Sequence, residues 1–118
     1  MKIIDIYNWE RKEHYDYYMK TDYPQFTICK NIDITNFKKQ LKNKGISFYY
    51  GMIYAATYTV NQIDDFKYRI KEKDVVLFER IHPTFTDMSE GTKLFKMVVA
   101  DYIDEIEEFA IKSKEKSK

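Results

Sequence analysis

The sequence has little of the material from which small catalytic or metal-binding centres are built. Its 118 residues contain one cysteine, Cys29, two histidines, His14 and His82, three glycines and two prolines. One cysteine forms no internal disulfide, and the cysteine and histidines have no metal-ligand spacing. The glycines form no phosphate-binding loop, and no serine lies in a nucleophile elbow. No motif for a metal, a nucleotide phosphate or a serine nucleophile is therefore present.

An excess of charge is also lacking. Twenty basic and 19 acidic side chains give a formal net charge of +1, too little for a field that recruits nucleic acid or anionic lipid. The first residues, MKIIDIYNWERKE, become charged too early for a signal peptide. We therefore predict a cytoplasmic protein with no nucleic-acid or membrane partner. The length fits a single domain over residues 1–118, with a frayed tail over about 113–118.

The longest uncharged stretch predicts a core helix. No residue between Lys44 and Asp64 is charged, and apolar residues recur at helical spacing across residues 46–63. Tyr50, Tyr54 and Tyr58 form an additional stripe, and each hydroxyl needs a partner once it is buried. The three tyrosines, with no basic flanking pattern, favour a core helix covered on most sides over a membrane span.

Shorter patterns on both sides of this helix predict an α/β fold. Alternating apolar residues indicate strands, and capping residues followed by helical periodicity indicate helices. The expected elements are a strand Lys2–Tyr7, a helix from Asn8 to Lys20, a strand Phe26–Ile34, a helix from Thr35 to Gly45, a hairpin of 66–70 and 75–81, a strand Thr84–Met88 and a helix Val98–Ser113.

Taken alone, the reactive residues favour structural roles. His14 lies on an expected helix, and His82 precedes a proline. An isolated histidine in such a place is more often structural or solvated than catalytic. Cys29 lies in an apolar expected strand, where a buried, inert thiol is favoured over a nucleophile.

Six segments in register carry a more specific signal. They are Asn8–Tyr15 (NWERKEHY), Ile32–Thr35 (IDIT), Phe48–Tyr49, Met52–Tyr54, Val60–Gln62 and Pro83–Thr86 (PTFT). In this order and near this spacing, they resemble the amino-terminal half of chloramphenicol acetyltransferase. The resemblance covers about Tyr7 to Phe109. It implies the first half of a two-layer α/β sandwich, a trimeric assembly, and acetyl-CoA and the antibiotic meeting at the subunit interface.

The resemblance also implies roles for particular residues. The aromatic wall of the family's acceptor pocket falls on Tyr17, Tyr18, Phe26 and Phe95. Without the resemblance, Tyr17 and Phe26 would be interpreted as core residues. Arg11 matches an arginine that the family pairs with an aspartate near the active site. Because that aspartate is missing from this chain, we expect Arg11 to find a substitute acid or to reach water.

One departure from the family bears on activity. The family's general base is a histidine in a His-His-x-x-x-Asp-Gly motif of the carboxy-terminal half, and the 118 residues contain no such motif. We therefore assign no catalytic or metal-binding residue, and expect no tight binding of acetyl-CoA by this chain alone.

Two classes of function remain. The chain is part of an acetyltransferase, as a fragment or as one piece of a split enzyme completed by a separate carboxy-terminal chain. Alternatively, it is a non-catalytic module that binds an aromatic small molecule or self-associates as a dimer or trimer.

Overall fold

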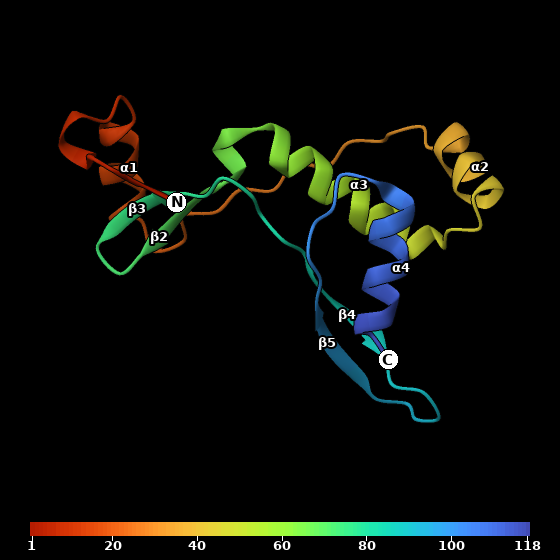
Figure 1. Ribbon diagram of the computed structural model, residues 1–118. Coiled ribbons are helices and arrows are strands. Elements are labelled where there is room, and N and C mark those ends of the chain that lie inside the picture. The colour runs from red at the N-terminus through yellow and green to blue at the C-terminus, as the bar shows by residue number, and fades with distance from the viewer.

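A computed structural model describes residues 1–118 as a mixed α/β chain with two small antiparallel sheets (Figure 1). The helices are α1 (Lys12–Met19), α2 (Thr35–Asn43), α3 (Phe48–Gln62) and α4 (Ile106–Lys116), with short 3₁₀ helices at Ile6–Asn8 and Asp64–Phe66. The strands are β1 (Lys2–Ile4), β2 (Tyr68–Lys71), β3 (Asp74–Leu77), β4 (Thr84–Met88) and β5 (Phe95–Val99). None of the helices combines the length and apolar composition needed to cross a bilayer.

The first sheet has the strand order β1-β3-β2. The hairpin of β2 and β3 was predicted, and Tyr68 pairs with Leu77 at its open end. Glu72 in its turn adopts a positive φ of 57°. The central strand β3 buries Val75 and Val76, as expected for a strand with neighbours on both sides.

The second sheet pairs β4 with β5 and carries the main core on one face. Phe85 is opposite Val98, and both are buried with Ala100 and Phe109. Because side chains alternate along a strand, the residues between them point to the other face. Helices α3 and α4 lie on the core side, where Tyr50, Ile53 and Tyr54 pack against this cluster. These are the two layers that the fold prediction described.

Helix α3 is the predicted core helix, with Ser47 as its N-cap. Two of its three striped tyrosines find hydroxyl partners: Tyr50 donates to Asp87, and Tyr54 donates to the carbonyl of Asp104. The prediction that the helix is covered on most sides is wrong. Only Gly51 and Thr57 are fully buried, and Met52 and Tyr58 are exposed.

The amino-terminal predictions need correction in their boundaries. Strand β1 ends at Ile4, and Asp5 then caps the 3₁₀ turn by accepting from the backbone N–H of Tyr7. Asn8 does not cap a helix, because its side chain donates to Asp5 instead. Helix α1 consequently begins only at Lys12.

The expected strand Phe26–Ile34 is absent as a paired strand, and residues 24–34 lie outside every helix and strand. Cys29 is exposed, so the predicted buried thiol is also wrong. Helix α2 is present near its predicted place but begins at Thr35, which was predicted to be its cap; the Thr35 backbone N–H and hydroxyl instead donate to Asp33. Gly45, at a φ of 67°, follows its end.

The carboxy-terminal helix begins later and ends later than predicted. Val98 and Val99 belong to β5, where they pair with Phe85 and Thr84. Helix α4 then runs from Ile106 to Lys116 and includes part of the expected tail. The hydroxyl of Ser117 anchors it by donating to Asp87 at 2.6 Å.

The chain is unusually open for its size. Its radius of gyration is 17.7 Å, whereas a compact domain of this length has about 13.5 Å. Its accessible surface is 9848 Å², whereas a folded monomer of 14.4 kDa exposes about 6,800 Å². Only 12 of 118 residues are buried. About 3,000 Å² of surface is therefore exposed beyond what a self-contained fold of this mass shows.

Candidate functional site

Arg11 precedes α1 and pairs with an acid at the far end of α3. Its Nη2 lies 2.8 Å from Oδ1 of Asp65. The hydrogen bond and the charge of Asp65 raise the pKa of the Arg11 guanidinium. Beside this pair, the ring of Trp9 packs on Tyr68 with centroids 5.3 Å apart. The prediction that Arg11 finds a substitute acid is confirmed.

The four aromatic residues assigned to an acceptor pocket are all exposed. Tyr17 and Tyr18 meet edge to face on α1, with ring centroids 5.4 Å apart. Phe26, 79% exposed, lies on the unpaired segment after α1, and Phe95, 69% exposed, begins β5. The structure thus brings the two tyrosines together but encloses no pocket among the four.

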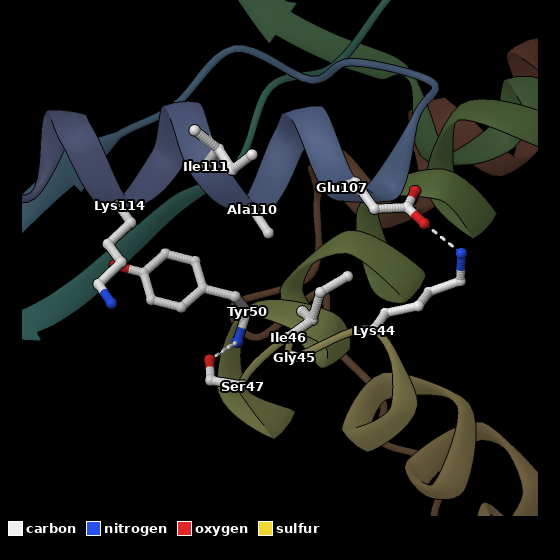
Figure 2. Close-up of a pocket in the computed structure, with 9 residues that line it drawn as sticks. All are labelled: Lys44, Gly45, Ile46, Ser47, Tyr50, Glu107, Ala110, Ile111 and Lys114. Atoms are coloured by element: carbon white, nitrogen blue, oxygen red, sulfur yellow. Dashed lines mark hydrogen bonds and ion pairs between the residues drawn. The ribbon is translucent and has the colours of Figure 1, made fainter.

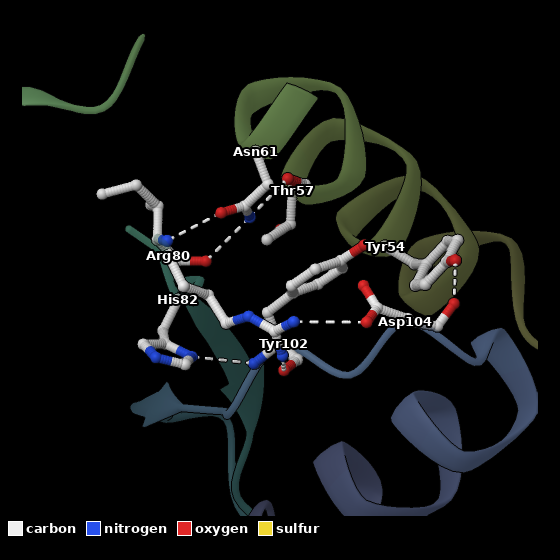
Figure 3. Close-up of polar contacts among 8 residues, drawn as sticks. Tyr54, Thr57, Asn61, Arg80, His82, Tyr102 and Asp104 are labelled. Atoms are coloured by element: carbon white, nitrogen blue, oxygen red, sulfur yellow. Dashed lines mark hydrogen bonds and ion pairs between the residues drawn. The ribbon is translucent and has the colours of Figure 1, made fainter. Parts of the chain in front are cut away.

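His82 accepts a backbone hydrogen bond. The N–H of Tyr102 donates to its Nδ1 at 2.9 Å, so the neutral ring carries its proton on Nε2 (Figure 3). In that tautomer neither nitrogen is free to take a proton from a substrate hydroxyl. Arg80, two residues earlier, donates to the carbonyl of Tyr102 and to Asp104. The histidine belongs to a structural set of contacts between two connecting segments.

The other reactive side chains have no partners that would activate them. His14 is exposed on α1 and makes no side-chain hydrogen bond or ion pair. Cys29 is exposed on the unpaired segment, with no hydrogen bond to a base. A general base or an activated nucleophile needs a neighbour that orients or polarises it. No group of three or more metal-ligating side chains is present either.

A hollow of about 380 Å³ lies between the α2–α3 turn and α4 (Figure 2). Lys44 forms an ion pair with Glu107 at one end. The neighbouring Glu105 carboxyl and then the Lys44 ammonium lower the pKa of Glu107 to about 2, while Glu107 raises the pKa of Glu105. The hydroxyl of Ser47 is occupied as the α3 cap. The hollow therefore holds charges and apolar walls but no free nucleophile or base.

Comparison with known proteins places these features in a family. A sequence model of chloramphenicol acetyltransferase matches residues 1–118, the whole chain. The chain belongs to the chloramphenicol acetyltransferase family. It is 32% identical over 108 residues to chloramphenicol acetyltransferase 3 of Escherichia coli, covering 92% of this chain and 51% of that protein. It is 30% identical over 106 residues to chloramphenicol acetyltransferase 2 of Haemophilus influenzae, covering 90% and 50%.

The fold agrees with this membership. A solved chloramphenicol acetyltransferase superposes with a TM-score of 0.87 at 28% identity, covering 96% of this chain and 53% of that one. The chain thus spans about half the length of the chloramphenicol acetyltransferases it matches. The predicted family is confirmed, and so is the prediction that the chain matches about half of the length of its members.

Sequence reasoning missed several residues that organise this half of the family fold. It anticipated an acid or water beside Arg11 but did not identify Asp65, because the sequence does not show which of its many acids the fold brings next to Arg11. It also missed Asn61, whose side-chain amide donates to the carbonyl of Ile81 and accepts from the backbone N–H of the same residue. The helical pattern gave no signal for this, since an asparagine near a helix end more often faces solvent.

Proposed function

We propose that the chain supplies the acceptor-binding half of an acetyl-CoA-dependent O-acetyltransferase and has no transfer activity by itself. The observation that carries this proposal is the match to about half of each relative, in a chain whose two histidines are unsuited to act as base. The 118 residues hold the four aromatic residues of the predicted acceptor wall and lack the His-His-x-x-x-Asp-Gly motif.

The chemistry explains why the base matters. In O-acetylation, the acceptor hydroxyl oxygen attacks the thioester carbonyl, its proton passes to a general base, and coenzyme A leaves as the thiol. A neutral hydroxyl is a poor nucleophile without that base. His82 has its Nδ1 occupied, and His14 has no orienting partner. A histidine from outside these 118 residues would have to supply the step.

The acceptor would be an aromatic small molecule that carries a hydroxyl. Tyr17, Tyr18, Phe26 and Phe95 would wall its site, because apolar aromatic surfaces suit drug-sized aryl ligands. Arg11, held by Asp65, would stiffen the start of the helix that carries the tyrosines. Because these side chains are exposed in the isolated chain, the pocket would close only on assembly.

The partners follow from the same reasoning. One is a complementing chain with the His-His-x-x-x-Asp-Gly motif, and another is the chain itself in a dimer or trimer. The exposed free thiol of Cys29 fits a reducing compartment such as the cytoplasm.

Acetyl transfer to chloramphenicol, measured with radiolabelled acetyl-CoA, tests the proposal. We expect the purified chain to give the rate of a protein-free blank, with full-length E. coli chloramphenicol acetyltransferase 3 as positive control. Transfer by the chain that His14→Ala or His82→Ala abolishes would overturn the proposal, since one of these histidines would then be the base.

A second candidate is a non-catalytic module that binds an aromatic compound or self-associates. The large exposed apolar surface favours it, because such surface marks binding sites. Calorimetry with chloramphenicol separates the two candidates. Micromolar binding by the isolated chain that Tyr18→Ala weakens would favour the module, whereas an acceptor site split between two chains predicts no measurable heat.

A further inference from the structure

The segment between α1 and α2 has an unusual hydrogen-bonding state. Residues 26–33 make no backbone hydrogen bond at all within the chain, and the segment crosses from the α1 side of the molecule to α2 (Figure 1). Every buried backbone N–H and C=O needs a partner. A stretch this long without partners stays in water or is paired by another polypeptide.

The side chains of this segment follow a strand pattern. Phe26, Ile28 and Ile32 occupy even positions, with Lys30 between the two isoleucines, and are 79%, 80% and 77% exposed. The intervening residues are polar or small, and Thr27 and the isoleucines favour extended backbone. Solvated loops are usually built from polar, glycine and proline residues, whereas apolar residues at even spacing are typical of a strand. The segment has the composition of a strand and lacks the neighbour that would make it one.

We propose that residues 26–32 are a docking strand, to which a complementing acetyltransferase chain adds a β-strand. The proposal rests on the proposed function, since it takes that partner as the occupant. An added strand would pair the free backbone groups, as in other cases of β-strand addition. Its apolar side chains on the same face would pack beside those of Phe26, Ile28 and Ile32.

The amount of uncovered surface favours a complementing chain over a second copy. The chain exposes 9848 Å², about 3,000 Å² more than a monomer of its mass. A standard protein interface covers only about 800 Å² on each partner. A partner as long as the unmatched half of the relatives, which is about as long as this chain, is large enough to cover the difference.

Hydrogen exchange gives the direct test. The chain is measured alone and after coexpression with a tagged polypeptide comprising the unmatched carboxy-terminal half of E. coli chloramphenicol acetyltransferase 3. Alone, amides 27–32 should exchange at the rate of an unstructured peptide. In the copurified complex, alternate amides of this stretch should exchange about 100-fold more slowly.

Proline substitutions provide the matched variants. Ile28→Pro and Asn31→Pro each remove one backbone N–H. Because successive N–H groups of a strand point to opposite edges, the two variants test one edge each. Because neither N–H is bonded within the chain, the midpoint of thermal unfolding of the isolated chain should not change. Affinity for the partner should fall about tenfold or more for at least one variant. Asn31→Ala keeps the N–H and should bind within about twofold of wild type.

The outcomes separate this inference from the proposed function. Failure to copurify, or a complex in which residues 26–32 stay unprotected, overturns the docking strand even if acetyl transfer is restored. Protection that grows with the concentration of the chain alone assigns the strand to a second copy and overturns the proposal. A complex with protected amides and no acetyl transfer sustains the docking strand and contradicts the proposed function.

Discussion

At the scale of single residues, Asp87 joins three elements. It lies on β4, and its Oδ2 accepts from Tyr50 of α3 and from Ser117 after α4, each at 2.6 Å. These hydrogen bonds, that of Ser117 first, hold the pKa of Asp87 below its ordinary range. Burial, with the neighbouring carboxylate, raises the pKa of Tyr50 to about 12. The charged carboxylate therefore fastens both helices to the sheet.

Asp87→Asn should lower the free energy of unfolding by about 2 kcal/mol at pH 7, because two charge-assisted hydrogen bonds become neutral or are lost. Urea denaturation measures this. Tyr50→Phe and Ser117→Ala each remove one donor and should each cost about 1 kcal/mol. Wild-type stability in Asp87→Asn would mean that water replaces both contacts without loss.

The same carboxylate predicts a pH dependence. The pKa of Asp87 is lower in the folded chain than its ordinary value. Its contribution is therefore complete above the unfolded pKa and is lost as the pH falls through the folded one. The stability difference between wild type and Asp87→Asn should stay constant from about pH 5 to 8 and shrink below about pH 4. A difference that instead grows in acid would contradict the assigned sign.

Residue roles were only partly predictable from sequence. We predicted that Arg11 would find an acid or reach water, because an unpaired charge beside apolar surface is costly. The identity of the acid, Asp65, depends on how α3 ends. His82 was expected to be structural, and the reason, its contact with the Tyr102 N–H, joins residues 20 apart. The acceptor wall came from family resemblance alone, and its four residues remain a prediction.

At the scale of elements, Asn61 fastens α3 to the connection between β3 and β4 (Figure 3). Its amide accepts from the N–H of Ile81 at 2.8 Å and donates to the carbonyl of that residue at 2.9 Å. Asn61→Ala leaves both groups without partners and should cost about 2 kcal/mol in urea denaturation. Thr59→Ala, which removes only an exposed bond to the preceding turn, should change stability by less than about 0.5 kcal/mol.

Helices α2 and α3 approach each other at Gly51. A Cβ placed there would lie 2.4 Å from Cδ1 of the buried Leu41. Gly51→Ala gains about 1 kcal/mol of helix propensity but overpacks this contact by about 1–3 kcal/mol, so a net loss of about 1 kcal/mol is expected. In a Leu41→Ala background the same change should become neutral or stabilising. Equal effects in both backgrounds would exclude the clash.

The elements that sequence predicted best are those whose partners lie nearby in the chain. The β2–β3 hairpin and β4 were found because alternation and a short turn specify them locally. Val98–Ser113 was misjudged because Val98 and Val99 fit both a helical and a strand period, and only pairing with β4 decides between them. Residues 26–34 have the pattern of a strand, but a strand also needs a neighbour.

At the scale of the whole molecule, the outer face of the β4–β5 sheet is uncovered. Alternate residues point away from the core, and Met88, Phe95, Met97 and Val99 are exposed there. Apolar faces and open strand edges of this kind recruit further chains. We therefore expect the isolated chain to sediment as a dimer or trimer at micromolar concentration.

Met97→Lys should shift this species to the monomer, because it places a charge at the centre of the face. Ile111→Lys, on α4 and equally exposed, serves as the control and should not. A wild-type chain that sediments as a monomer would show that neither the face nor the edges associate.

The unpaired segment also determines how long such a chain would last in a cell. Proteases bind their substrates as extended strands, and residues 24–34 already present that shape, with Lys30 among them. Brief trypsin treatment should cut first after Lys30, without waiting for the molecule to unfold. Copies whose segment is covered would survive and bare copies would be degraded. The abundance of the chain would then follow the supply of whatever covers it.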